Sequence, residues 1–462
     1  MKKIILKLFV LIVFVTTVAV CSPPLRIMSY NLLNYPGSDA ATRDPYFRAV
    51  IQSVLPDILV CEEVQTQAGV DNFRNQVLNI YQPGLYSSVA FHDGPDTDNM
   101  LFYKSDKVTF ISMNFISTAL RDIAEYVVRP KWSNETLRIY ALHLKANDTP
   151  DDAASRNAEC TILRNYLNQL PTGTNFIIVG DFNIYRSTEA CYQTLISSTT
   201  DNDGRVKDPL VMSGEWQDNT SYKIYHTQSP RRRSFGGGST GGLDDRFDLM
   251  LPSYPLFDKN IIQTNTYKAY GNDGNHLNDS INKLPNTAVP DSVAHGLHYS
   301  SDHLPVMCDF NFPDTVAAIT YMMSVHPGWN LISLPVTVYN SSKLVLFPSA
   351  KSNAYYFTNT GQYAYDVSLR DKVGYWLKFD SSETFSLYGK PRTSDSINVN
   401  TGWNLIGGTG IDVLTSNITT IPTGIIQSPF YGYDKKYLQM DTLKSSHSFF
   451  IRVNASGKIV LK

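Results

Sequence analysis

The sequence predicts an α+β protein in two parts: a larger N-terminal domain of two packed mixed sheets with helices outside them, and a separate C-terminal all-β domain. Three observations predict this architecture. From residue 25 to about 313, short apolar or aromatic runs alternate with helix-like stretches. After "CDFNFPDTVAAI" the helix-like stretches stop and an internal repeat begins. A chain of 462 residues also exceeds what one hydrophobic core usually supports.

The N-terminus predicts export. "MKKIILKLFVLIVFVTTVAVC" has a short basic start and an apolar run, and polarity returns directly afterwards, which is typical of a secretory signal peptide over residues 1–21. Two alternatives stay open. The run approaches the ~20 residues of a membrane span, and Cys21 could carry a lipid anchor, although Val20 before it is larger than the residue that bacterial lipid attachment prefers. We expect a secreted or cell-surface protein with no stable span after cleavage.

The N-terminal domain is expected over residues 22–313. Helix-like stretches occupy residues 42–54, 66–80, 152–169 and 187–197. The glycines of "SFGGGSTGGLDDRFD" disfavour a helix and cannot fill a core, so they predict a mobile surface segment beside Asp248. Export permits disulfides. Cys160 and Cys191 lie in helix-like stretches on either side of one strand, and their pairing is left open.

The C-terminal domain, residues 314–462, contains an internal repeat. "VHPGWNLISLPV" at 325–336 recurs as "VNTGWNLIGGTG" at 399–410, which gives units of about 325–398 and 399–462. Each unit is short enough to be half of one β-domain. The repeat resembles the Gly-Trp-Asn-Leu modules at the C-termini of secreted bacterial proteins. It carries no cluster of acids and histidines, so structural, sorting and cell-surface adhesion roles are all open.

Polar side chains stand at the edges of six apolar runs in the N-terminal domain. Burying so many polar groups separately would cost several kcal/mol each, so we expect one shared cleft at an end of the sheets. The runs, with these side chains, are "LRIMSYN" (Asn31), "PDILVCEE" (Glu62, Glu63), "LRIYALHLK" (His143, Lys145), "NFIIVGDFN" (Asp181, Asn183), "RFDLMLP" (Asp248) and "YSSDHLPVMCDF" (Asp302, His303).

The residue types favour metal-assisted hydrolysis of a phosphoester. Carboxylates and an amide without a cysteine motif suit Mg²⁺ or Mn²⁺ rather than zinc. Two histidines can accept and donate protons near neutral pH. The chain has neither a GxSxG elbow nor a GxxxxGK[ST] loop, so serine hydrolysis and nucleotide cradling lack their usual sequence support. The oxygen-rich segments "DNDG" (201–204) and "GNDGNHLND" (271–279) leave a structural Ca²⁺ open.

Residues 25–313 resemble the endonuclease/exonuclease/phosphatase superfamily with the deoxyribonuclease I fold. The motifs "SYNLLNY", "PDILVCEEV", "HLK", "GDFN", "RFD" and "SDHLPV" follow in family order. The resemblance implies a four-layer α/β/β/α sandwich of two mixed sheets. It also implies metal-side ligands at Asn31, Glu63 and Asp302. Glu62 departs from the family pattern, because it stands where family members usually have Gln.

The resemblance also implies catalytic roles. His303 would take the proton of the attacking water while Asp248 fixes its tautomer, and His143 would donate to a phosphate oxygen or the leaving group. Asp181 and Asn183 would position water and phosphate. In some members the counterpart of Asp181 is argued to be the base, and the sequence does not decide between Asp181 and His303.

The substrate expectation is nucleic acid. The formal net charge is −2, so no global basic field points to such a partner. Export favours an extracellular endonuclease. Its contacts with a phosphate backbone would come from Lys145 and from the basic triplet Arg231, Arg232 and Arg233 in a long loop. The alternatives are a sphingomyelinase-type phospholipase, another phosphoesterase of the superfamily, and a non-enzymatic surface adhesion protein. We expect a monomer.

Overall fold

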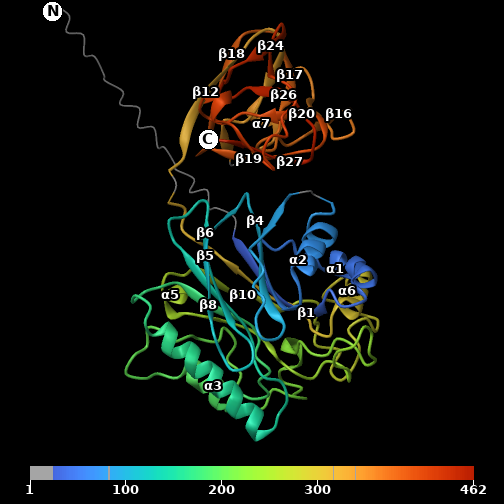
Figure 1. Cartoon of the computed structure of the whole chain (residues 1–462), viewed down its shortest axis with the longest axis vertical. Helices are drawn as coiled ribbons and strands as arrows, with labels where there is room; N and C mark the ends of the chain where they lie inside the picture. The colour runs from blue at the N-terminus through green and yellow to red at the C-terminus, as the bar shows by residue number, and fades with distance from the viewer. Residues whose placement is uncertain (1–23, 82–83, 316, 339) are drawn as a thin grey trace, which may run out of the picture.

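The computed structural model describes residues 24–462 except 82–83, 316 and 339. The predicted signal peptide, residues 1–21, lies outside the described residues. Within the described part of the chain, every helix is too short or too polar to span a bilayer. Figure 1 shows two bodies stacked along the long axis, the N-terminal one with helices and the C-terminal one built almost entirely of strands.

Two mixed sheets form the centre of the N-terminal domain, as the sequence predicts. The first has the order β10-β11-β1-β2-β4-β3. Its strands are β1 (Leu25–Tyr35), β2 (Ile58–Val64), β3 (Tyr86–Ser88), β4 (Asp98–Lys104), β10 (Ile262–Ala269) and β11 (Val306–Phe310). The second has the order β5-β6-β7-β8-β9. Its strands are β5 (Val108–Ile116), β6 (Ile123–Pro130), β7 (Leu137–His143), β8 (Phe176–Asp181) and β9 (Asp248–Pro252).

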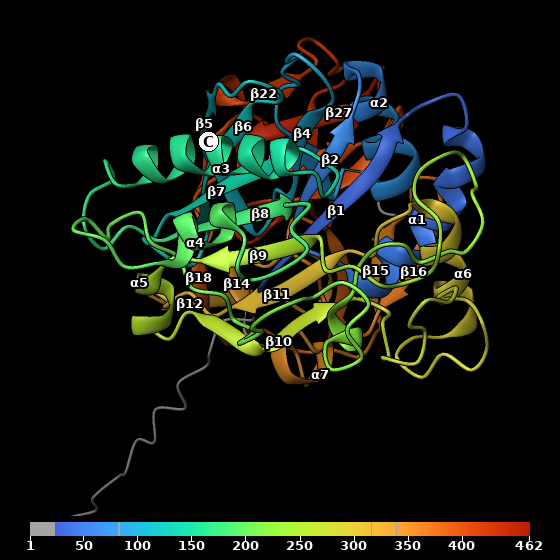
Figure 2. The same ribbon diagram turned by 90° about the horizontal axis from the view of Figure 1, so that it is seen from below.

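Strand direction brings the polar ends of these runs to one edge. β1 and β2 are parallel, as are β7 and β8, so each pair ends on the same side of its sheet. The register places His143 opposite Asp181 and, across the antiparallel β8–β9 pair, Asp181 opposite Asp248. The two sheets contact one another through β1, β2, β7 and β8. Chain segments far apart in sequence therefore meet at one end of the sandwich (Figure 2).

Helices cover both outer faces and complete the four layers. α1 (Ala40–Val54), α2 (Gln67–Asn72), η1 (Phe73–Leu78) and α6 (Asp291–Ser300) pack beside the first sheet, and α3 (Pro150–Leu167) and α4 (Ala190–Ile196) beside the second. α3 begins two residues before the predicted start, because the Thr149 hydroxyl accepts a hydrogen bond from the amide of Asp152 and Pro150 is favourable in the first turn. α5 (Tyr254–Asp258) and η2 (Lys223–Tyr225) lie in the connecting loops.

The C-terminal domain repeats one arrangement of strands. Its first unit has the sheets β12-β18-β14 and β13-β17-β15-β16, and the second has the corresponding sheets β19-β27-β22 and β20-β26-β23-β24, with a small β21-β25 ribbon. The bounds are β12 (Ile319–Val325), β13 (Gly328–Ile332), β14 (Val336–Val338), α7 (Lys343–Leu346), β15 (Ala354–Phe357), β16 (Tyr363–Asp366), β17 (Tyr375–Phe379), β18 (Glu383–Pro391), β19 (Asp395–Val399), β20 (Gly402–Gly407), β21 (Val413–Leu414), η3 (Thr415–Asn417), β22 (Thr419–Ile421), β23 (Phe430–Asp434), β24 (Lys436–Met440), β25 (Thr442–Leu443), β26 (Ser448–Val453) and β27 (Gly457–Leu461).

The repeated Gly-Trp-Asn-Leu motif begins β13 and β20. Gly328 and Gly402 have φ of +93° and +101°, a region that favours glycine. The Asn330 side chain accepts from the amide of His326 and donates to its carbonyl, and Asn404 bonds to Asn400 in the same way. Gly and Asn thus shape the same turn twice. Each unit also has its own apolar core, and a third cluster joins the two.

The C-terminal domain touches the N-terminal one at the end of the sheets opposite the polar edge. The ammonium of Lys390 lies 6.0 Å from the ring centre of Trp132, which follows β6 in the turn before β7. β7 is seven residues long, which corresponds to about 20 Å, and His143 stands at its other end. The amide of Asn134 also donates to the Thr315 hydroxyl in the segment between the domains. The polar edge therefore stays uncovered by the C-terminal domain.

Candidate active site

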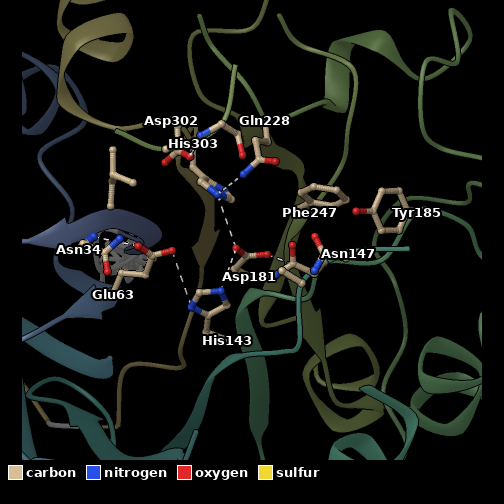
Figure 3. A pocket seen from close by; sticks show the side chains of 15 residues that line it. Asn34, Glu63, His143, Asn147, Asp181, Tyr185, Gln228, Phe247, Asp302 and His303 are labelled. Atoms are coloured by element: carbon tan, nitrogen blue, oxygen red, sulfur yellow. Dashed lines mark hydrogen bonds and ion pairs between the residues drawn. The ribbon is translucent and has the colours of Figure 1, made fainter. Parts of the chain in front are cut away.

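The polar ends of the strands line one cleft of about 280 Å³ (Figure 3). It is open to solvent and has room for a phosphate group and the atoms beside it. Its lining includes most of the side chains that the sequence singles out: Glu63, His143, Asp181, Asn183, Asp302 and His303. Asn31 lies directly beside them, bonded to Glu63 and Asp181. Side chains as far apart in the sequence as Asn31 and His303 therefore lie close together at this cleft.

Asp181 is the centre of the cluster. Its Oδ2 lies 3.5 Å from His143 Nε2 and 3.6 Å from His303 Nε2, and it accepts a hydrogen bond of 3.2 Å from the Asn31 amide. Its Oδ1 accepts from the backbone amide of Asn183 at 3.1 Å. One carboxylate oxygen thus lies beside two imidazoles, and all three groups line the cleft.

His303 is held at both ring nitrogens. Nδ1 lies 2.8 Å from Asp248 Oδ2, and Nε2 lies 2.6 Å from the side-chain nitrogen of Gln228. Asp248 accepts the Nδ1 proton, so the neutral ring carries its lone pair on Nε2, the nitrogen that faces the cleft and Asp181. The contact has the geometry of an imidazole oriented by a carboxylate, the pairing that the family resemblance implies for these two residues. Gln228 was not anticipated, because a single glutamine in a loop carries no pattern.

The metal-side residues form the neighbouring wall. Asn31 Nδ2 donates to Glu63 Oε1 at 2.9 Å, and the backbone amide of Asn34 donates to Glu63 Oε2 at 2.8 Å. Glu63 has a φ of +59°, which turns its side chain out of the strand alternation. Asp302 Oδ2 accepts from the backbone amide of Ser239 at 2.6 Å, while its buried Oδ1 has no hydrogen-bond partner.

Glu62 points away from the cleft. It is fully buried and accepts a hydrogen bond of 2.8 Å from the hydroxyl of Ser29, so Glu63, and not Glu62, lines the site. Burial, together with the charges of Asp248 and Asp181, raises the pKa of Glu62 well above its usual value. A carboxyl with its pKa raised in this way resembles an amide in shape and, when protonated, in charge, which fits the Gln that the family resemblance implies at this position.

The site concentrates negative charge. Burial raises the pKa of Asp181 to about 7, with further contributions from Asp248 and Glu63. Burial and the nearby Asp302 also raise the pKa of Glu63. Burial opposes a charged His303, but Asp248 and Asp181 outweigh it and raise the pKa of His303 well above its usual value. Burial and the cation of Arg121 lower the pKa of His143. The pKa values of the two histidines are therefore shifted in opposite directions within one cluster.

These residues fit a hard divalent cation. Asn31, Glu63 and Asp302 offer amide and carboxylate oxygens, and one of these oxygens, Asp302 Oδ1, is buried without a partner. Mutual repulsion among the carboxylates would also be relieved by a cation. Within the described residues, no three His, Cys, Asp or Glu side chains converge as a complete cage. A Mg²⁺ ion bound here would take one or two of these carboxylates and keep several waters.

The structure corrects part of the expected substrate surface. Arg231 is fully buried and its guanidinium donates to the carbonyls of Phe235 and Gly237, so it braces its own loop and is not available to a phosphate backbone. Arg232 and Arg233 are exposed. Lys145 reaches Asp152 at 3.0 Å, which neutralises much of its charge.

The glycine-rich segment also differs from its expected role. Gly238 and Ser239 line the cleft, and the segment packs so closely on Asp302 that a Cβ at Gly238 would lie 2.5 Å from its Oδ2. It is one wall of the site, held there by the Ser239–Asp302 bond. The run of glycines was the available signal, since close backbone approach requires glycine.

In the oxygen-rich segment 271–279, hydrogen-bond donors of the protein itself satisfy the carboxylate of Asp273. The carboxylate of Asp273 accepts hydrogen bonds from the amides of Asn275 and Thr287, the Thr287 hydroxyl and the His276 ring. These bonds lower its pKa to about 2 despite the opposing effect of burial. A structural Ca²⁺ is not needed to hold this loop together.

The N-terminal domain is similar to known proteins. The model of the Endonuclease/Exonuclease/phosphatase family matches residues 28–303. No curated protein matches at a significant level. The solved structures similar to this chain include the human Nocturnin catalytic domain with bound sulfate, at 20% identity and a TM-score of 0.40, covering 63% of this chain and 95% of that one. Truncated TDP2 of Caenorhabditis elegans has 18% identity and a TM-score of 0.41, covering 62% and 98%. A family protein of Bacteroides thetaiotaomicron has 18% identity and a TM-score of 0.39, covering 63% and 99%.

Proposed function

The chain belongs to the endonuclease/exonuclease/phosphatase family, whose members are hydrolases of phosphoesters, and on this premise we propose that it is an exported, divalent-metal-dependent phosphodiesterase that cleaves DNA or RNA as an endonuclease. The observation that carries the proposal is the meeting of His303, Asp248 and His143 around Asp181, beside Glu63 and Asp302. Proton-transfer groups and cation ligands thus share one cleft.

Asn31, Glu63 and Asp302 would hold the Mg²⁺ or Mn²⁺. When bound, the cation supplies charge neutralisation at the phosphate and at the departing oxygen. Asp181 and His303 Nε2 face the same small space, so a water placed there would pass its proton to this pair. The two groups act as one proton acceptor, in which Asp248 keeps the ring oriented and Gln228 fixes Nε2 until the water takes its place as the donor to that nitrogen.

His143 stands on the other side of Asp181 and would contact a phosphate oxygen or the leaving group. Its Nδ1 is buried, has no hydrogen-bond partner and lies 3.9 Å from Glu63 Oε1. Asn183 keeps its side chain at the cleft by donating to the carbonyl of Leu144 at 3.1 Å. These two side chains would orient the phosphate relative to the attacking water.

Nucleic acid is the favoured substrate because the cleft is open and polar, and the exposed Arg232 and Arg233 belong to the loop that also brings Gly238 and Ser239 to the cleft, which suits an extended charged polymer. The predicted signal peptide supports export. Lipid attachment at Cys21 is a further part of the proposal. Contact of the C-terminal repeats with the cell surface is another.

The test is to incubate the purified protein with plasmid DNA, RNA and sphingomyelin, each with Mg²⁺ and with EDTA. We expect nicking of DNA or RNA with Mg²⁺ alone, and its loss in His303→Ala. His295→Ala is the matched control, since that histidine is exposed on α6 outside the cleft. Cleavage of sphingomyelin only would contradict the substrate assignment, and near-normal turnover by His303→Ala would contradict the mechanism.

Metal binding has its own readout. Calorimetric titration with Mn²⁺ should show a site in the wild-type protein that is weakened at least about tenfold in Glu63→Gln, because the amide keeps the shape but loses the charge that attracts the cation. Unchanged affinity in this variant would assign the cation to other residues.

A further inference from the structure

The repeated tryptophans are only partly used in building the C-terminal domain: Trp329 contacts the rings of Tyr355 and Trp376, and Trp403 contacts that of Tyr431. In both Gly-Trp-Asn-Leu motifs, glycine and asparagine form the turn, and Leu331 and Leu405 fill the cluster between the two units. Trp329 and Trp403, in contrast, remain 40% and 44% exposed. Two large apolar rings at equivalent exposed positions indicate a binding role.

The strand register defines one aromatic face around the tryptophan of each unit. Residues directly opposite one another in adjacent strands share one side of the sheet. On this basis the aromatic face comprises Trp329, Leu331, Tyr355, Phe357, Tyr363, Tyr365, Trp376 and Lys378 in the first unit, and Trp403, Leu405, Tyr431, Tyr433, Tyr437, Gln439, Phe450 and Arg452 in the second.

Ring contacts join the two halves of the face. The ring centres of Trp376 and Tyr433 are 4.7 Å apart, and those of Phe357 and Phe450 are 5.6 Å apart. The middle of the face is thus covered by contacts between the units. Its outer part is open, with Tyr365 58% exposed in addition to the two tryptophans.

The charges of the aromatic face are positive. Lys378 lies directly opposite Trp329 across β13 and β17, and Arg452 lies directly opposite Trp403 across β20 and β26. Both cations are exposed. Among the described residues of these two sheets, none of the side chains on this face is a carboxylate. Each unit therefore presents the same pair, a flat ring beside a cation.

We infer that the aromatic face binds single-stranded polynucleotide, with bases stacked on Trp329 and Trp403 and phosphates beside Lys378 and Arg452. A neutral polysaccharide would use the rings but has no charge for the cations to neutralise, whereas a single strand uses both. The face is distinct from the catalytic cleft and its binding does not depend on cleavage, so the inference goes beyond the proposed function.

The test measures binding without turnover. The full chain is titrated into a fluorescently labelled oligothymidylate in EDTA, and fluorescence anisotropy gives the Kd. We expect Trp329→Ala combined with Trp403→Ala to weaken binding at least about tenfold, since stacking is worth about 1–3 kcal/mol per base. Leu344→Ala is the matched control, an exposed apolar residue off the face.

A second variant does not touch the rings. Lys378→Gln combined with Arg452→Gln should reduce the slope of log K against log salt by about 1.4, because each phosphate contact on a single strand contributes about 0.7. Lys436→Gln, exposed on the opposite side of β24, should leave the slope unchanged. A duplex should bind more weakly than the single strand, since its bases are already stacked.

Three results would overturn the inference: no binding of the oligonucleotide, binding that both double variants retain in full, and retention on an insoluble polysaccharide that the tryptophan variant loses. The last result would assign the face to carbohydrate. None of the three depends on whether the cleft cleaves nucleic acid, so failure here is distinguishable from failure of the proposed function.

Discussion

Replacing Asp248 by Asn tests the role of the His303 pair most directly. Asp248 Oδ2 lies 2.8 Å from His303 Nδ1, and the two side chains are only 1% and 2% exposed, so water screens their interaction little. Asn keeps the shape but removes the charge. Its amide can also donate to Nδ1, which would place the ring proton on Nε2, where the lone pair is needed.

The size of the effect follows from that contact. A hydrogen bond to a charged group contributes about 1.5–3 kcal/mol, equivalent to a rate change of roughly 10-fold to 150-fold. The wrong tautomer adds to this, and the same substitution in serine-protease triads costs about 10⁴ in kcat. We therefore expect kcat to fall by about 10² to 10⁴ in Asp248→Asn, with KM within about threefold of wild type, because Asp248 positions a catalytic group without touching substrate.

The assay is the initial rate of phosphodiester cleavage with Mg²⁺ from pH 5.5 to 9. Asp57→Asn is the matched control: Asp57 is equally buried, accepts bonds from Lys104 and Lys107, and precedes β2 at the opposite end of the sheet from the cleft. That variant should lose stability and keep its kcat. Asp248→Asn with kcat within about threefold of wild type and an unshifted pH profile would refute the orienting role.

Three further outcomes are expected. Gln228→Ala should lower kcat about tenfold by releasing one nitrogen of the cleft imidazole, and an unchanged rate would show that this contact is incidental. The folded-state pKa values of Asp181 and Asp245, about 7 and about 8, lie above the unfolded value near 4, so the folded metal-free protein holds more protons and its stability should fall as pH rises from about 4 through 8. Mg²⁺ should then raise Tm more at pH 8 than at pH 5 in a thermal scan, and an equal gain at both values would contradict this. Cys160 and Cys191 are buried thiols in direct contact, so mass spectrometry of protein exported through an oxidising compartment should show them joined, and two alkylatable thiols after denaturation would contradict it.

The general fold and most of the cleft residues could be predicted from local patterns. Apolar runs of strand length, helix-like stretches and the internal repeat each depend on neighbouring residues, and the polar ends of the strands are visible in the order of the chain. The choice of Glu63 over Glu62 came from the family resemblance. The structure gives its physical basis: a positive φ turns Glu63 to the cleft while Glu62 lies against Ser29.

Other features depended on contacts between distant segments. The burial of Arg231, the contact of Gln228 with His303, and the closure of the glycine-rich segment over Asp302 join loops to strands across many residues. The aromatic face needs the pairing of four strands in each of two units. The sequence by itself determined which residue types were available and where strands begin and end, because these are local properties. Only the tertiary structure decided which polar groups face the same space, because burial and charge coupling depend on distance in three dimensions.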